Sequence, residues 1–103
     1  MTIEQLQEAN RVRGEKWGRP GLEFSAIELG GESGEVLNAV KKYIRFKNGM
    51  AGGVESLEPI EEELADVVIC ASLMSNDLNI NLTEAIRRKF NKTSEKHGFP
   101  DRL

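Results

Sequence analysis

The sequence predicts an all-α protein, a four-helix bundle-like single domain over residues 1–103 that assembles into an oligomer. Apolar residues recur at helical spacing in four segments, which glycine or proline separates, and no segment shows the clean alternation of a β-strand. Apolar residues make up 39% and charged residues 30% of the chain, a globular composition. A chain of this length forms only a modest core, so we expect oligomerisation to complete the burial.

Two helices and a loop are expected in the first half of the chain. The first helix runs from Thr2 to about Arg13, a stretch with few helix breakers. The segment "GEKWGRP" then predicts a turn, because its glycines and proline disfavour helical geometry. The second helix runs from about Leu22 to Phe46, and the glycine-rich "KNGMAGGVESLEP" follows it as a connection.

Two further helices are expected in the second half. Pro59 suits the first position of the third helix, and the glutamates after it complement the helix dipole. The body of this helix, "LADVVICASLMSNDL", is apolar on nearly every side, which predicts a place at the centre of the bundle. The fourth helix begins after Asn81, which forms a capping-box pattern with Glu84, and ends near His97 with Gly98 as its C-cap.

An unusual mixture of glycines and glutamates occupies the second helix. The segment "IELGGESGEVLNAV" contains Gly30, Gly31, Gly34, Glu28, Glu32 and Glu35. Each glycine inside a helix costs about 1 kcal/mol relative to alanine, so helix formation alone does not favour them. The glutamates fall on one narrow stripe with apolar and glycine neighbours. We therefore expect this stripe to face packed surface, where the glycines let another backbone or a ligand approach closely.

The third helix carries a matching acidic pair, Glu63 and Asp66, just before its apolar run. Antiparallel pairing of the two helices would bring Glu32 and Glu35 to this pair. Four converging carboxylates repel one another and need either protons or a counter-cation. Ligation by oxygen alone suits Mg²⁺, with Mn²⁺ as an alternative. For Glu28 and the "EEE" run, a solvated helix face explains the pattern equally well.

Charge and composition exclude several classes of function. A formal net charge of −3 gives no basic surface for a nucleic acid polymer. The beginning of the chain lacks a signal pattern, and no apolar run is long enough for a membrane span, so we expect a cytoplasmic protein without a membrane partner. The single cysteine, Cys70, lies in an apolar run and is interpreted as a buried structural thiol.

The motif "GGESGEV" followed by "EEELADVVICASLM" resembles the MazG-like all-α nucleoside triphosphate pyrophosphohydrolases. The resemblance extends from about Trp17 to Gly98. It matches Glu32 and Glu35 to the family's E-x-x-E motif and implies that they bind Mg²⁺ together with the residues of the following E-x-x-D motif, Glu63 and Asp66. It also implies hydrolysis of a (d)NTP to a (d)NMP and diphosphate, a homodimer or homotetramer, and a role in nucleotide-pool house-cleaning.

One position departs from the fuller family pattern. Gly31 stands where that pattern has a glutamate. The deoxycytidine triphosphatase-like branch of the family is similar, since it also reads G-E-x-G-E. Metal binding is therefore still expected, whereas the substrate preference and the identity of the general base stay open.

The remaining candidate residues concern catalysis and substrate binding. Glu32 is the first candidate for the general base and Glu28 the second. Basic residues near the acidic helix and on the fourth helix, together with one tryptophan, are the candidates for substrate binding: Lys89, Trp17, Lys42 and Lys92. The tryptophan is equally well explained as a lid on the core.

Two functions of other classes compete with this interpretation. A non-catalytic helical oligomeric interaction module would use the acidic stripe as surface and would not be stabilised by Mg²⁺. A carboxylate-bridged di-iron bundle would require Glu-x-x-His pairs, but Ser94 stands three residues before the single histidine, His97.

Overall fold

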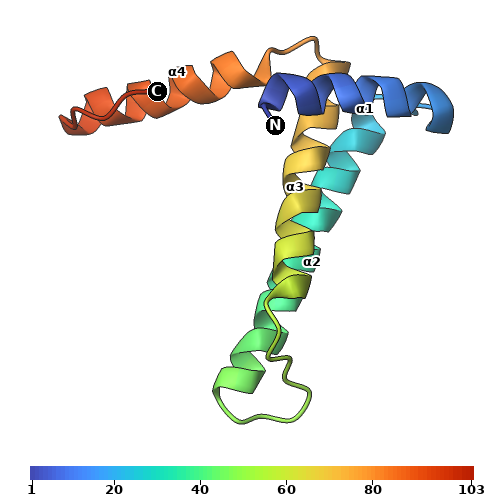
Figure 1. The fold of residues 1–103 in the computed structure, drawn as a ribbon, viewed down its shortest axis with the longest axis vertical. Helices are drawn as coiled ribbons and strands as arrows, with labels where there is room; N and C mark the ends of the chain where they lie inside the picture. Colours follow the sequence, from blue (N-terminus) through green and yellow to red (C-terminus); the bar gives the residue numbers. More distant parts are fainter.

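Four α-helices and no β-strand make up the protein. The computed structural model describes all 103 residues, with α1 at Ile3–Trp17, α2 at Leu22–Lys47, α3 at Glu58–Asp77 and α4 at Leu82–His97. Helices α2 and α3 lie side by side as a long antiparallel pair, and α1 crosses one end of this pair (Figure 1). Helix α4 starts at the same end and extends away from it. The all-α class is confirmed.

A single chain does not close these helices into a compact bundle. The Cα radius of gyration is 16.9 Å, whereas a compact chain of about 100 residues has roughly 13 Å. Only seven of the 103 residues are buried, and Cys70 is the only apolar one among them. Helix α4 contacts α1 and does not pack along α3, so Leu64 and Val68 of α3 remain 51% and 46% exposed. The expected central position of α3 is therefore not reached within one chain.

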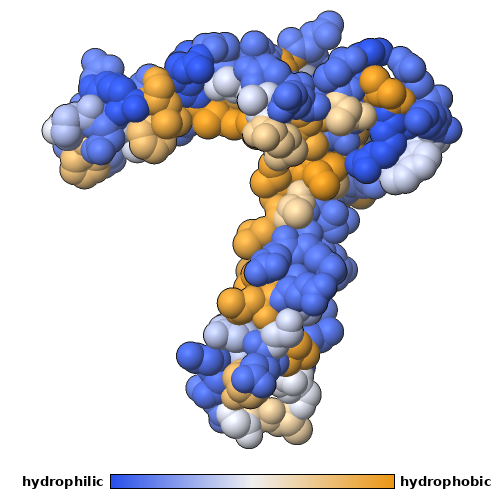
Figure 2. Space-filling model, in the orientation of Figure 1, coloured by the Kyte–Doolittle hydropathy of each residue, from blue (hydrophilic) through white to orange (hydrophobic).

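Apolar side chains remain exposed on several helices. Ile27 and Leu37 of α2 are 73% and 70% exposed, and Ile86 and Phe90 of α4 are 42% and 44% exposed. Figure 2 shows hydrophobic atoms along the inner side of the angle between α4 and the α2–α3 pair. None of the helices is long and apolar enough to span a membrane.

Helix α1 is longer than the sequence predicts, because it continues from Arg13 to Trp17. Gly14, interpreted above as part of a turn, is helical and buried. A Cβ atom at Gly14 would lie 2.9 Å from Cγ and Cδ of Arg19, so the close passage of this arginine favours glycine there. The helix ends at Gly18, whose φ of +80° is a conformation that suits glycine.

The other helix boundaries agree with expectation to within about one residue. Helix α3 begins at Glu58, one residue before Pro59. At α4, the Asn81 side chain accepts a hydrogen bond from the Glu84 backbone N–H, while the reciprocal bond of a capping box is not formed. Gly98 adopts the left-handed conformation at the end of α4, which confirms its prediction as the C-cap.

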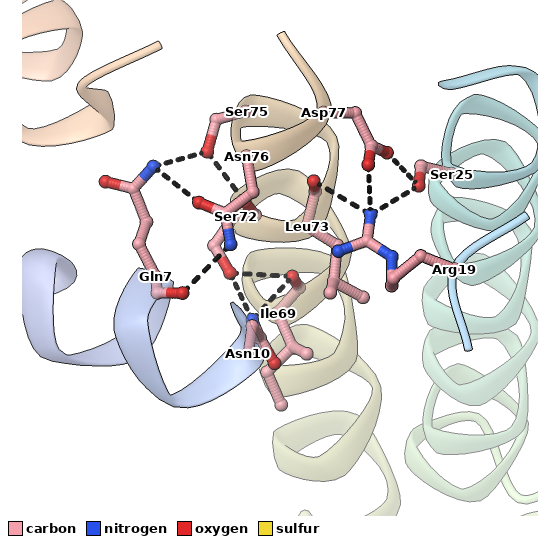
Figure 3. Close-up of polar contacts among 10 residues, drawn as sticks. All are labelled: Gln7, Asn10, Arg19, Ser25, Ile69, Ser72, Leu73, Ser75, Asn76 and Asp77. Carbon is pink, nitrogen blue, oxygen red and sulfur yellow. Dashed lines mark hydrogen bonds and ion pairs between the residues drawn. The ribbon is translucent and has the colours of Figure 1, made fainter. Parts of the chain in front are cut away.

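Buried polar side chains join α1 to α3. The Asn10 amide donates to Ser72 Oγ and, at 3.4 Å, to the carbonyl of Ile69 (Figure 3). One turn earlier on α1, Gln7 Nε2 donates to Ser75 Oγ at 2.8 Å. The α1–α3 contact is therefore built around hydrogen bonds, and these satisfy the polar groups that it buries.

An ion pair fixes the turn between α1 and α2. Arg19 in this turn donates to Asp77 Oδ1 at 2.5 Å, to Ser25 Oγ at 3.2 Å and to the Leu73 carbonyl at 3.2 Å. Ser25 Oγ donates in turn to the other carboxylate oxygen of Asp77 at 2.5 Å. We call Arg19, Ser25 and Asp77 the turn tether, because together they connect the turn to the ends of α2 and α3 (Figure 3).

Candidate metal centre

Three carboxylates from two helices converge halfway along the α2–α3 pair. Glu32 comes from α2, while Glu63 and Asp66 lie one turn apart on α3. One oxygen from each carboxylate lies within 4.8 Å of the others. We call these residues the acidic trio. The antiparallel packing of α2 against α3 produces this meeting, as the sequence predicts.

Glu35, the fourth predicted ligand, is not a member of the trio. It is exposed and follows Glu32 by three residues on α2. It lines a cavity together with Glu63, so it lies beside the trio and further from α1. Its role as a ligand stays a prediction.

The electrostatics of the trio show that its charges are not compensated by the protein. Partial removal from water, followed by the charge of Asp66 and the neighbouring Glu63 carboxyl, raises the pKa of Glu32. None of the ion pairs of the chain includes a trio residue. An all-oxygen donor set with uncompensated negative charge fits a hard divalent cation such as Mg²⁺.

The surroundings of the trio are more open than the sequence suggests. Asp66 is exposed, while Glu32 and Glu63 are half-buried. A Cβ atom at Gly30, Gly31 or Gly34 would meet no atom within 4 Å. The close approach that we expected at these glycines is therefore not made within one chain.

A cavity of about 310 Å³ adjoins the trio on the side of α1. Its acidic wall contains Glu28 together with two trio residues, Glu32 and Asp66. Another part of the lining comes from α1, where the guanidinium carbon of Arg13 lies 4.9 Å from the centre of the Trp17 ring. Trp17 is 80% exposed, so it does not cover a core in this chain. Its predicted contact with substrate stays a prediction.

A second, smaller cavity of about 160 Å³ lies on the other side of the trio, toward the α2–α3 loop. Its lining includes side chains that can donate hydrogen bonds and two carboxylates: Asn38, Lys42, Ser56, Glu35 and Glu63. Lys42, which the sequence predicts as a substrate-binding residue, is thus adjacent to the proposed ligands.

The predicted substrate-binding lysines of α4 lie elsewhere. Lys89 and Lys92 line neither cavity. Helix α4 projects away from the α2–α3 pair (Figure 1). One chain therefore does not bring these two lysines to the acidic trio.

Cys70 is buried and lines the larger cavity. Burial raises the pKa of its thiol, and the negative charges of Glu28 and Glu32 raise it further. Both effects suppress the thiolate, so the residue is a poor nucleophile. This supports the interpretation of Cys70 as a structural residue.

Sequence reasoning named Trp17 of α1 but missed Arg13, which also lines the larger cavity. Arg13 and Trp17 are four residues apart, a spacing at which helical side chains meet, and this signal could have identified Arg13. Arg13 also donates to Asn10 Oδ1 at 3.1 Å. For Arg19 no such signal exists, because its partner Asp77 is remote in the sequence.

Most of the chain is similar in sequence to known proteins. Residues 24–99 match a sequence model described as the MazG nucleotide pyrophosphohydrolase domain. The chain is also 33% identical over 76 residues to the Gene 37 protein of Mycobacterium phage L5. That match covers 74% of this chain and 66% of the phage protein, which is slightly less than two thirds of the relative's length. No solved structure matches the chain.

Proposed function

Because this chain belongs to the MazG nucleotide pyrophosphohydrolase family, we propose that it hydrolyses a (d)NTP to a (d)NMP and diphosphate with the help of Mg²⁺. The observation that carries this proposal is the convergence of Glu32, Glu63 and Asp66 within 4.8 Å, beside a cavity of about 310 Å³. Pockets of at least about 300 Å³ are typical of small-molecule sites. The cavity is therefore large enough for a nucleoside next to the carboxylates.

We assign metal binding to the acidic trio and to Glu35. A bound Mg²⁺, or Mn²⁺ in its place, neutralises charge on the phosphate oxygens. The chain itself contributes the carboxylates and the half-buried position of Glu32 and Glu63. The reaction adds a water oxygen to the α-phosphorus and breaks its bond to the oxygen shared with the β-phosphorus, so diphosphate leaves.

Glu32 and Glu28 are the candidates for the base that takes the proton of this water. Glu32 is our first assignment, because it belongs both to the trio and to the larger cavity. Glu28 lines the cavity without belonging to the trio, so Glu28→Gln should keep metal binding even if turnover falls.

Substrate binding is assigned to both ends of the site. Trp17 would stack on the base, and Lys42 would bind phosphate oxygens. Lys89 and Lys92 could reach the site only from a second chain. We therefore include a homodimer or homotetramer in the proposal, supported by the small number of buried residues and by the exposed apolar side chains. Light scattering that finds a monomer at assay concentration would contradict this part.

The activity is tested with a panel of ordinary, deoxy and damaged nucleoside triphosphates in the presence of Mg²⁺. We expect release of diphosphate and of the corresponding monophosphate. Release of single phosphates instead would contradict the assignment of the reaction, although the metal site could stand. A preference for non-standard triphosphates would support a role in nucleotide-pool house-cleaning.

A non-catalytic oligomeric interaction module is the second candidate. The exposed apolar side chains of α2 and α4 favour it, because surfaces of this kind mark contacts with other proteins. This candidate predicts oligomerisation without hydrolysis and without stabilisation by Mg²⁺. The same panel of triphosphates, combined with thermal unfolding, separates it from the enzyme.

A further inference from the structure

The smaller cavity has a position that the proposed reaction does not yet explain. It lies on the side of the acidic trio away from α1, and it shares Glu63 with the trio. The larger cavity shares Glu32 and Asp66 with the same trio. The trio therefore separates two cavities of different size, about 310 Å³ and about 160 Å³.

The wall of the smaller cavity is formed by a specific fold of the α2–α3 loop. The backbone N–H of Val54 donates to the carbonyl of Lys42 at 3.1 Å, which holds the loop against α2. Gly53 makes this approach feasible, because a Cβ atom there would lie 2.5 Å from the backbone nitrogen of Phe46 and 2.6 Å from its Cα. The sequence predicts only a connection here, whereas the structure shows a segment packed back onto α2.

Three residues that line this cavity have side chains able to donate hydrogen bonds to phosphate oxygens. Lys42 has an ammonium, Asn38 an amide and Ser56 a hydroxyl. Glu35 and Glu63 are also present, and they would repel an anion unless a cation lies between them and it. The mixture of donors and metal-ligating carboxylates is therefore suited to an anion that arrives together with a divalent metal.

The two cavities differ in what they can accommodate. The larger one contains the aromatic rings of Trp17 and Phe24, which suit a base and sugar. The smaller one has no aromatic side chain, and its volume falls below the range typical of organic ligands. At roughly 30 Å³ per water molecule, it holds a group about the size of five waters.

We propose that the smaller cavity binds the terminal diphosphate of the substrate and retains it briefly as the leaving product, while the nucleoside occupies the larger cavity. This inference rests on the proposed function. The triphosphate would then extend along the α2–α3 pair, with its α-phosphate at the acidic trio. Lys42 acts at the leaving diphosphate and does not contact the nucleoside.

The test measures binding of two products separately by calorimetry with Mg²⁺ present. The probes are imidodiphosphate, a diphosphate analogue that resists hydrolysis, and a set of ordinary nucleoside monophosphates. Lys42→Ala should weaken imidodiphosphate binding about tenfold or more, the loss expected for a hydrogen bond between charged groups. Binding of the monophosphates should change less than about twofold. Lys42→Arg, which keeps the charge, should retain most of the affinity for imidodiphosphate.

Lys41→Ala is the matched control, because Lys41 is the adjacent exposed lysine and lines neither cavity. Trp17→Ala should show the opposite selectivity, with weaker monophosphate binding and unchanged imidodiphosphate binding. Equal effects of Lys42→Ala and Lys41→Ala on imidodiphosphate would overturn the inference. So would the absence of Mg²⁺-dependent imidodiphosphate binding by the unsubstituted protein.

The two proposals can fail separately in these experiments. If the protein binds imidodiphosphate through Lys42 but hydrolyses no triphosphate, the assignment of the diphosphate site stands and the proposed reaction is contradicted. A protein that releases diphosphate from triphosphates, with imidodiphosphate binding insensitive to Lys42→Ala, would retain the reaction and lose the assignment of the smaller cavity.

Discussion

The junction of α1 with α3 and the middle of the α2–α3 pair differ in whether their polar and charged side chains have partners within the chain. At the junction, buried polar groups find partners within the chain, as Asn10 does with Ser72 and Arg19 with Asp77. In the middle of the pair, the carboxylates of Glu32, Glu63 and Asp66 approach one another and find no positive partner. The polar groups of the junction are satisfied by the protein itself, whereas the charges of the acidic trio are compensated only when a cation binds.

This difference indicates separate roles: residues at the junction position the walls of the site, and residues of the acidic trio bind the cation. The turn tether holds the α1–α2 turn, and residues of this turn and of α1 form one wall of the larger cavity. Two residues of the acidic trio, Glu32 and Asp66, also line this cavity, and the repulsion among the trio carboxylates is unfavourable energy that a cation would relieve. Substitutions at the junction should therefore act mainly on stability, and substitutions in the trio mainly on turnover.

The largest expected effect comes from neutralising a trio residue. Glu63→Gln or Asp66→Asn removes a ligand for a cation that supplies several kcal/mol of charge stabilisation in the transition state. Turnover of the best triphosphate should fall at least about a thousandfold, or about 4 kcal/mol in the barrier. Circular dichroism should show an unchanged helical fold, and the metal-free protein should melt no lower than the parent, because one repelling charge is gone.

Glu61→Gln is the control for this experiment, because Glu61 lies in the exposed first turn of α3. Its turnover should stay within about twofold of the parent. If Asp66→Asn unfolded the protein while Glu35→Gln kept full activity, the carboxylates would be structural. The contrast between the two regions would then disappear.

The next effect concerns the turn tether. Asp77→Ala leaves the Arg19 guanidinium, only 25% exposed, without its partner. Breaking a buried ion pair costs about 3 kcal/mol in the free energy of unfolding, and urea denaturation measures it. The exposed pair of Arg11 with Glu15 provides the comparison, since Glu15→Ala should cost less than about 1 kcal/mol. Similar losses of unfolding free energy for both substitutions would show that the turn tether stabilises the protein no more than an exposed ion pair does.

The sequence predicts the α2–α3 pair and its carboxylates because both follow from local spacing. Glu32 and Glu35 lie three residues apart on one helix, and the same spacing on the next helix returns Glu63 and Asp66 to the same place once the helices pair. No comparable periodicity in the sequence predicts the junction of α1 with α3. Ser72 and Ser75 lie within an apolar run of α3. Their hydrogen bonds with Asn10 and Gln7 form only because α1 packs across α3 at this point.

Gly14 and the direction of α4 illustrate the same limit. A glycine before a turn usually marks the end of a helix, but here it leaves room for Arg19 of the following segment. The length of α4 and its C-cap follow from local signals, whereas no local signal indicates that α4 contacts α1 and extends away from the α2–α3 pair. Local spacing therefore predicts the helices and the convergence of Glu32, Glu63 and Asp66, while the positioning contacts are set by tertiary packing.

Mg²⁺ should stabilise the protein through the acidic trio and Glu35, and not through the junction. At a free concentration of about 100 times the dissociation constant, binding to the folded state adds about 2.7 kcal/mol to the free energy of unfolding. A thermal melt should therefore shift upward by several degrees with Mg²⁺ and return with a chelator. Glu63→Gln should lose this shift and Asp77→Ala should keep it, although its melt starts lower. A melt that Mg²⁺ leaves unchanged would favour the interaction module.

The smallest effect is a change of stability with pH in the metal-free protein. Because the folded-state pKa of Glu32 lies above its ordinary value of 4.5, its protonated form is favoured by folding. Its contribution to stability is fully present below pH 4.5 and is lost as the pH rises through the folded-state pKa. Urea denaturation with a chelator should therefore show Glu32→Gln gaining stability relative to the parent as the pH rises above 4.5. With saturating Mg²⁺ the sign should reverse, because the cation binds the deprotonated carboxylate. If the stability difference between Glu32→Gln and the parent changed neither with pH nor with Mg²⁺, the Glu32 carboxylate would be as well compensated by the protein as the polar groups at the junction. The contrast between the two regions would then fail at Glu32.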